Sequence, residues 1–290
     1  MGNDARQLLE RVEDLPPLPA VAARVMTMAD DANSSALDMA QVLSSDQALT
    51  AKLIRISNSA YYGFARKVST VREAVVVLGM KQVRQVAVGA SLMNSFNGRR
   101  IDDDVFDIDL FWGHSVAVAI AAETIAKKTR AARPEDAFTA GILHDIGRLV
   151  LRQVMPHEFR SAVVMAIQGT PLHVAELETT GYAHDEIGLA LGEKWKFPTH
   201  LVDAVAHHHR EGLSPEHDGL EGVVALANAL VLHYGLYCGF DVEDAELVPI
   251  PPELDRVETM CGGIDHLLDR SFAFIESASG TPQRWYAGAA

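Results

Sequence analysis

The sequence predicts an all-α protein, a multi-helix bundle with an N-terminal helical subdomain. Ala, Val and Leu are abundant and aromatic residues make up only 7% of the chain, a composition that favours helices packed on helices. Apolar residues recur at helical spacing, and no convincing alternation of apolar and polar residues indicates a strand. The hydrophobic content of 48% is ample for a packed core.

The first part of the chain is predicted to form a series of short helices. We expect them over residues 4–13, 19–29, 36–43, 46–57, 71–78 and 81–96. The prolines of Leu15-Pro16-Pro17-Leu18-Pro19 end the first helix, and Gly79 ends the fifth. Thr70 and Glu73 fit a capping box, in which a hydroxyl and a carboxylate each satisfy a free backbone N–H.

Basic residues gather around the turn at Gly79, which raises the question of a helix-turn-helix motif. They are Arg66, Lys67, Arg72, Lys81 and Arg84. A net charge of −14 repels nucleic-acid backbones and argues against this interpretation, so no direct nucleic-acid partner is expected. Core packing explains the apolar face of these helices, which consists of Val75, Val76, Leu78, Val83 and Val86.

The second part of the chain follows a polar, acidic stretch over residues 97–109, which includes Asp102, Asp103 and Asp104. We expect helices over residues 111–128, 134–145, 157–168, 171–178, 184–195, 197–209 and 221–234, and one tail helix over about 264–274 after the prolines at 249–252. The expected domains are an N-terminal helical part (1–108), a helical bundle (109–238) and a C-terminal helical extension (239–290).

The sequence predicts a cytoplasmic protein with no membrane partner. Charged residues precede any apolar run at the N-terminus, so no secretory signal is visible. The most apolar stretch, Val116 to Ala122, is too short to span a bilayer. Cys238 and Cys261 have no CxxC spacing, and we expect both to be small buried residues in a reducing compartment.

The stretch from Gly141 to Arg148 places an adjacent His144 and Asp145 at the end of an apolar helix. An imidazole and a carboxylate side by side can serve one metal ion from one backbone segment. Gly147 is predicted to stop this helix. A His-Asp pair is weak evidence by itself, so other ligands have to converge on it.

Further histidines stand at positions from which a compact bundle could bring them to the same pocket. His114 lies near a helix start, His184 opens a later helix, and His208 and His209 close the next one. Bundle cores often hold dinuclear metal sites built from histidines and carboxylates. Each histidine also has an ordinary explanation as a helix cap or as an imidazolium favoured at a helix C-terminus.

The chain resembles the metal-dependent HD phosphohydrolase superfamily, and most closely the HDOD domain (HD-related output domain) of bacterial signalling proteins. The resemblance covers roughly residues 10–235. Its marks are Leu15-Pro16-Pro17-Leu18-Pro19, Ile56-Ser57-Asn58-Ser59-Ala60-Tyr61-Tyr62, the segment from Ala74 to Gly79, Trp195-Lys196-Phe197-Pro198, and the ordered histidines. It implies an all-helical fold in which an N-terminal helical part rests on an HD-domain-like bundle. It also implies a metal set of His114, His144, Asp145, His184, His208 and His209.

Departures from the superfamily pattern bear on function. The resemblance places a metal-binding Asp after the paired histidines in catalytic members, where this chain has Asn228. An Asn carbonyl can accept a coordination bond but brings no negative charge. Arg148 stands where a Lys often follows the HD motif, and its guanidinium can hold phosphate. The Gly-Tyr-Pro signature of the HD-GYP cyclic-dinucleotide phosphodiesterases is absent.

Three hypotheses follow from these observations. The first is a signal-transduction output module that binds a metal or a small ligand, has no catalytic residues and acts through contacts with signalling proteins. The second is a metal-dependent phosphohydrolase acting on a nucleotide or a cyclic dinucleotide, and the third is a scaffold with structural histidines. The nitrogen-rich ligand set suits one or two ions of iron, manganese, zinc or nickel better than calcium.

Overall fold

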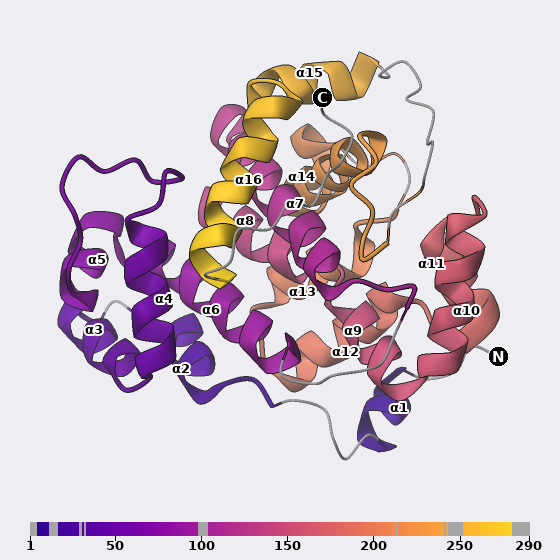
Figure 1. The fold of residues 1–290 in the computed structure, drawn as a ribbon, viewed down its shortest axis with the longest axis horizontal. Helices are drawn as coiled ribbons and strands as arrows, with labels where there is room; N and C mark the ends of the chain where they lie inside the picture. Colours follow the sequence, from indigo (N-terminus) through magenta and orange to yellow (C-terminus); the bar gives the residue numbers. More distant parts are fainter. Residues whose placement is uncertain are drawn as a thin grey trace. The chain divides into compact units, whose positions relative to one another are not determined.

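Every regular element that the structure describes is a helix, so the all-α prediction is confirmed (Figure 1). The computed structural model describes residues 5–11, 17–28, 31, 33–97, 104–210, 212, 214–240, 242 and 252–279. The first helices are α1 (Ala5–Arg11), α2 (Ala20–Met28), α3 (Ala36–Ser44), α4 (Gln47–Ser57), α5 (Val71–Leu78), α6 (Met80–Asn97), α7 (Ile108–Thr129) and α8 (Pro134–Leu143). The remainder are α9 (Ile146–Val154), α10 (Pro156–Ile167), α11 (Leu172–Thr180), α12 (His184–Lys194), α13 (Thr199–His207), α14 (Pro215–His233), α15 (Pro252–Cys261) and α16 (Ile264–Ser279).

The chain forms two compact units that are interleaved in sequence. The bundle unit comprises Met1–Leu15 and Arg100–Ile264, and the N-terminal unit comprises Pro16–Arg99 and Asp265–Ala290. These units do not coincide with the three expected segments (1–108, 109–238 and 239–290). The difference arises because α1 packs on α12 in the bundle unit, while most of α16 belongs to the N-terminal unit.

In the N-terminal unit, α5 is an eight-residue helix that packs against α3, α4 and α6 with one face. The Thr70 hydroxyl accepts the Glu73 N–H at 3.1 Å, and the Glu73 carboxylate accepts the Ser69 N–H at 2.7 Å, so both expected capping groups are used. The expectation that Val76 belongs to the core is wrong. Its side chain is 70% exposed, because so short a helix buries a single face and Val76 points away from it, whereas Val75 is buried.

In the bundle unit, α7 is a central helix that packs against α8 and α14. Asp107 caps its start, where its carboxylate accepts the Asp109 N–H at 2.7 Å. The helix extends well beyond the apolar run seen in the sequence, and its 22 residues are long and apolar enough to cross a membrane by composition. However, 78% of its most apolar part is buried inside the protein, which makes α7 a core helix of the bundle unit.

Two glycines allow the helices around the His-Asp pair to approach closely. A Cβ on Gly141 would lie 2.5 Å from the Cα of Ala119, so Gly141 permits α8 to pack tightly on α7. The prediction that Gly147 stops a helix is wrong, because α8 ends at Leu143 and Gly147 lies inside α9. A Cβ there would lie 2.0 Å from the carbonyl oxygen of His184, so glycine is needed for the contact between α9 and α12.

The tail contains two described helices where one was expected. Pro252 stands at the first position of α15, where a proline is favourable, and α15 packs on α7 and α14. The expected helix near residue 264 is α16. The expected proline break (Pro249 and Pro251) and the acidic residues Asp102 and Asp103 lie outside the described residues.

Candidate metal centre

His144 and Asp145 form the tight turn that joins α8 to α9. His144 retains right-handed helical backbone angles after α8, and Asp145 precedes the first residue of α9. Both side chains are completely buried. A carboxylate is rarely buried unless it has charged or hydrogen-bonding partners, so the surroundings of Asp145 define the site.

The Asp145 carboxylate lies between two groups of imidazoles. Its Oδ2 is 3.4 Å from Nε2 of His114 and 3.3 Å from Nε2 of His144. Its Oδ1 is 3.1 Å from Nε2 of His184 and 3.5 Å from Nε2 of His208. Potential ligand atoms therefore form two clusters that share Asp145, one with His114 and His144 and the other with His184, His208 and His209.

Four of the five histidines direct their other nitrogen at a fixed acceptor. Nδ1 of His114, His144 and His208 lies 2.7 Å from the carbonyl oxygens of Leu236, Gly141 and Val205, and Nδ1 of His184 lies 2.5 Å from Oε2 of Glu176. An Nδ1 that faces an acceptor carries the proton, which leaves Nε2 free as a ligand. Such outer contacts are typical of histidines that bind metals.

The free nitrogens then face one another at short range. Nε2 of His114 and of His144 are 3.2 Å apart, and Nε2 of His184 lies 3.2 Å from Nε2 of both His208 and His209. Facing lone pairs repel unless positive charge lies between them. A proton on His184 is one source of that charge, and a divalent cation is another.

Burial and charge set the protonation of these groups. Burial lowers the pKa of His144 to about 4, and it also lowers the pKa values of His208 and His209. Burial and Arg148 oppose a charge on His184, but Glu176 and Asp145 outweigh them and raise its pKa to about 9. The neutral imidazoles are in the form that binds a metal ion, whereas His184 would have to release its second proton when a metal ion binds.

Arg148 and Glu176 form hydrogen bonds and ion pairs with the side chains of the two clusters. Nη1 of Arg148 donates to Oδ2 of Asp145, and Nε donates to Oε1 of Glu176 at 2.7 Å. Burial disfavours ionisation of Asp145, yet Arg148 and His144 keep its pKa well below the usual value. Asp145 is therefore an anion at neutral pH.

Glu176 was not predicted from the sequence, although it is completely buried and connects Arg148 to His184. It lies on α11, two residues before Glu178, which is exposed. The sequence does not indicate which of the two glutamates is buried, because polar and apolar residues of α11 are not segregated to opposite faces. Its role becomes visible only when the fold places His184, the first residue of α12, beside Glu176.

Cys238 is buried as expected, but it lies at the edge of the site. Its thiol interacts with Arg148 and Asp145, and burial together with the Asp145 charge raises its pKa well above the ordinary value. The thiol is thus neutral. The sequence predicted no functional role for Cys238, because a single cysteine outside a CxxC spacing does not indicate a metal site or a disulfide.

A cavity of about 310 Å³ adjoins the cluster. Arg148, His209 and Cys238 line its inner side, and Thr170, His173 and Tyr237 add polar groups. His173, which carries no signal in the sequence, stacks on His209 with ring centroids 4.5 Å apart. The remainder of the wall is mostly apolar, as in many small-ligand pockets.

The structure thus brings all six expected metal ligands into the two clusters that share Asp145. Asn228 is buried on α14, which packs against the helices of His114 and His144, and its Oδ1 accepts no hydrogen bond from the described residues. Arg148 lines the cavity but is already paired with two carboxylates. The donor set and the buried Oδ1 of Asn228 fit a divalent transition metal.

Comparison with known proteins identifies the family. The model of the HDOD domain matches residues 15–211, and the chain belongs to this family. A crystal structure of an HDOD domain protein of unknown function from Geobacter sulfurreducens is 25% identical, covers 95% of each chain and has a TM-score of 0.74. A candidate phosphohydrolase from Shewanella amazonensis SB2B is 26% identical, covers 93% of this chain and 95% of its own, and has a TM-score of 0.68.

A curated relative shows that the match extends to a longer protein. An uncharacterised protein from Treponema pallidum (strain Nichols) is 25% identical over 232 residues, which are 78% of this chain. The chain spans 44% of the length of that relative. The family and the fold together define a regulatory or HD-like module.

Proposed function

We propose that this protein is a cytoplasmic signal-transduction output module whose buried His-Asp clusters bind one or two divalent transition metal ions without hydrolysing a substrate. The observation that carries the metal proposal is the convergence of Nε2 atoms on Asp145. Their Nδ1 groups are held by acceptors, so the site is oriented for a cation before the cation arrives.

Two observations favour a non-catalytic site. Asn228 supplies no charge where catalytic relatives are expected to have Asp. Oδ2 of Asp145 already accepts a charged hydrogen bond from Arg148, which withdraws electron density from the oxygen that would have to bind a metal strongly. Both features reduce the negative charge available to stabilise two closely spaced cations.

Within the proposed site, the residues of this chain have distinct tasks. His114 and His144 would hold one ion and His184, His208 and His209 a second, with Asp145 between them. Glu176 and Arg148 orient His184 and Asp145. A bound divalent ion would supply Lewis acidity and lower the pKa of a coordinated water. The cavity beside His209 offers room for a small anionic ligand, and signalling proteins would be the partners that receive the output.

A hydrolysis assay tests the non-catalytic part of the proposal. Protein reconstituted separately with manganese, iron, zinc or nickel is incubated with a cyclic dinucleotide and with simple phosphodiesters. We expect no turnover above that of Asp145→Ala. Steady hydrolysis by the wild-type protein that is lost in Asp145→Ala would overturn the proposal and establish a phosphohydrolase.

The phosphohydrolase alternative is supported by the retention of all six ligands and by the cavity that Arg148 and His209 line. The variant Asn228→Asp separates the two possibilities, because it restores the missing negative charge. Activity in Asn228→Asp with none in the wild-type protein would show that the substitution at residue 228 is what silences the site.

A further inference from the structure

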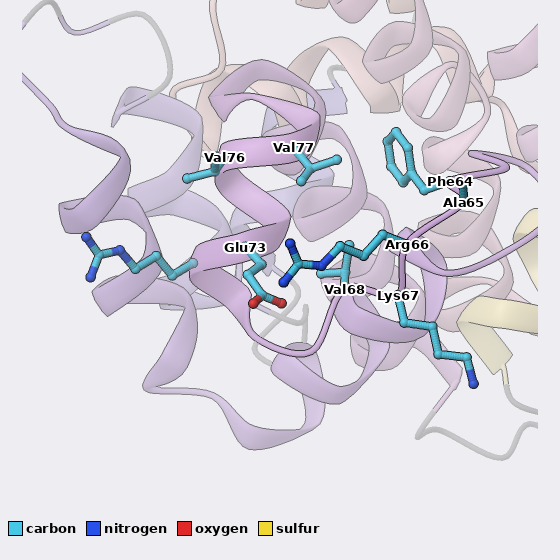
Figure 2. A pocket seen from close by; sticks show the side chains of 9 residues that line it. Phe64, Ala65, Arg66, Lys67, Val68, Glu73, Val76 and Val77 are labelled. Atoms are coloured by element: carbon cyan, nitrogen blue, oxygen red, sulfur yellow. The ribbon is translucent and has the colours of Figure 1, made fainter.

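A pocket of about 400 Å³ lies in the N-terminal unit, between α5 and the loop that precedes it. Figure 2 shows Val76 and Val77 on the helix side and Phe64 to Lys67 on the loop side. All the lining residues belong to the N-terminal unit, so the pocket is separate from the metal centre. We call it the α5 groove.

The α5 groove exposes large apolar side chains. Phe64 is 40% exposed, Val77 49% and Val76 70%. Single exposed apolar residues are ordinary, but a concave group of them beside a helix marks a binding surface more often than chance. Burying these side chains against a partner would supply the apolar part of an interface.

The rim of the α5 groove is cationic. Arg66, Lys67 and Arg72 line it, and within the described residues none of the three has a hydrogen-bonding or charged partner. The single carboxylate of the groove, Glu73, accepts the Ser69 N–H. This positive rim stands on a chain whose net charge is −14, so it is a local reversal of the overall charge.

The loop that forms one wall is held in a defined conformation. Asn58 donates to the Val68 carbonyl at 2.7 Å and accepts the Val68 N–H at 2.8 Å, which closes the loop at its base. The ring of Tyr62 stacks on that of Phe64, with centroids 5.9 Å apart. Tyr61 in turn packs against Phe274 of α16. Fixed walls reduce the entropic cost of binding.

We infer that the α5 groove docks an acidic segment of a partner protein that carries apolar side chains. The positive rim selects carboxylates, and the apolar floor of Phe64, Val76 and Val77 accepts aliphatic or aromatic anchors, the pattern expected for an amphipathic peptide in a groove. A nucleic acid carries charge along its whole length and would meet the acidic remainder of the chain, whereas a short peptide contacts only the positive rim, since salt screens more distant charges. A lipid surface does not enter a recessed pocket. The inference does not depend on metal binding.

Fluorescence anisotropy on the full chain tests the inference. The probe is a fluorescein-labelled helical peptide with Glu and Asp on one face and Leu and Phe on the other, and a second peptide has Ser in place of Leu and Phe. The test variant carries Arg66→Glu with Lys67→Glu. The matched control carries Arg24→Glu with Arg55→Glu, which makes the same change of charge at two exposed residues of the same unit outside the groove.

We expect the acidic apolar peptide to bind the wild-type protein. The affinity should be about tenfold lower for Arg66→Glu with Lys67→Glu and should change less than about twofold for the matched control. Val76→Ser should weaken binding without a change of charge. Equal binding by all variants, or equal binding of the Ser peptide, would overturn the inference. So would groove-dependent binding of DNA or phosphatidylserine vesicles in place of the peptide, or self-association of the chain through the groove.

Discussion

The two candidate sites depart from the usual distribution of residues in opposite directions. The metal centre buries charged and polar side chains, with Asp145, Glu176 and His184 completely inside the bundle unit. The α5 groove instead exposes apolar side chains at the surface of the N-terminal unit. A buried charge needs partners and an exposed apolar group needs a cover, so each site indicates a different kind of ligand.

The difference also predicts where mutations affect stability. In the candidate metal centre, ion pairs link Asp145, Arg148 and Glu176, so one substitution leaves several groups unsatisfied. In the α5 groove the side chains have few partners within the chain, so substitutions should alter binding and leave the fold intact. The following predictions test this contrast, in order of decreasing effect.

Asp145→Ala should lower the free energy of unfolding by about 3–5 kcal/mol, because it leaves the buried Arg148 guanidinium without one of its two carboxylate partners. Urea unfolding in the presence of a chelator measures this cost apart from any bound metal. The control Asp269→Ala removes an exposed carboxylate and should change stability by less than about 0.5 kcal/mol. Equal effects of both substitutions would contradict the buried ion-pair network.

Val75→Asp and Val76→Asp place the same charge at neighbouring positions of α5. Val75 is 2% exposed, so the substitution there should cost about 3 kcal/mol or more through an unpaired buried carboxylate. Val76 is 70% exposed, and its substitution should stay within about 0.5 kcal/mol. Thermal unfolding of both variants measures the two losses of stability. Equal losses would show that Val76 is buried like Val75 and would contradict an exposed groove.

Gly147→Ala should destabilise the protein by about 1–3 kcal/mol, since the added methyl group overlaps the backbone of His184 and must push α12 away from α9. The same displacement should weaken metal binding at the His184 cluster. Chemical unfolding and metal titration measure the two effects. A normal stability with normal metal affinity would show that the contact between α9 and α12 is looser than the structure indicates.

Glu176→Gln should lower metal affinity about 10- to 100-fold while the fold remains, because the neutral amide no longer fixes His184 through a charged contact. Competition with a chromophoric chelator measures the change. Glu178→Gln, an exposed neighbour on the same helix, is the control and should retain wild-type affinity.

The sequence predicted the helices well because their signals are local. In the structure Pro134 is the first residue of α8, where a proline needs no N–H partner. Gly79 and Gly169 follow the ends of α5 and α10 with the positive φ that glycine adopts readily. Gly147 misled the prediction because glycine also serves close helix contacts, and those involve α12, far along the chain. The packing of α1 on α12 in the bundle unit could not be predicted either, because the two helices are far apart in the sequence.

The candidate metal ligands were predicted as an ordered set of histidines and one aspartate, and the family resemblance joined them into one site. Glu176, Cys238 and His173 were missed because their contacts with the set depend on tertiary packing, not on spacing. The exposed position of Val76 was missed for a related reason. A helical wheel shows which face of a short helix is apolar, but it does not show how many of those residues are buried against other helices.

The most direct test of the central claim is the metal content of the purified protein, measured by elemental mass spectrometry beside Asp145→Ala. The account predicts about one or two equivalents of a transition metal in the wild-type protein, as expected for a carboxylate-bridged site, and loss of that metal in the variant. No metal in the wild-type protein, even after reconstitution with manganese, iron, zinc and nickel, would contradict the account and leave the histidines with a structural role.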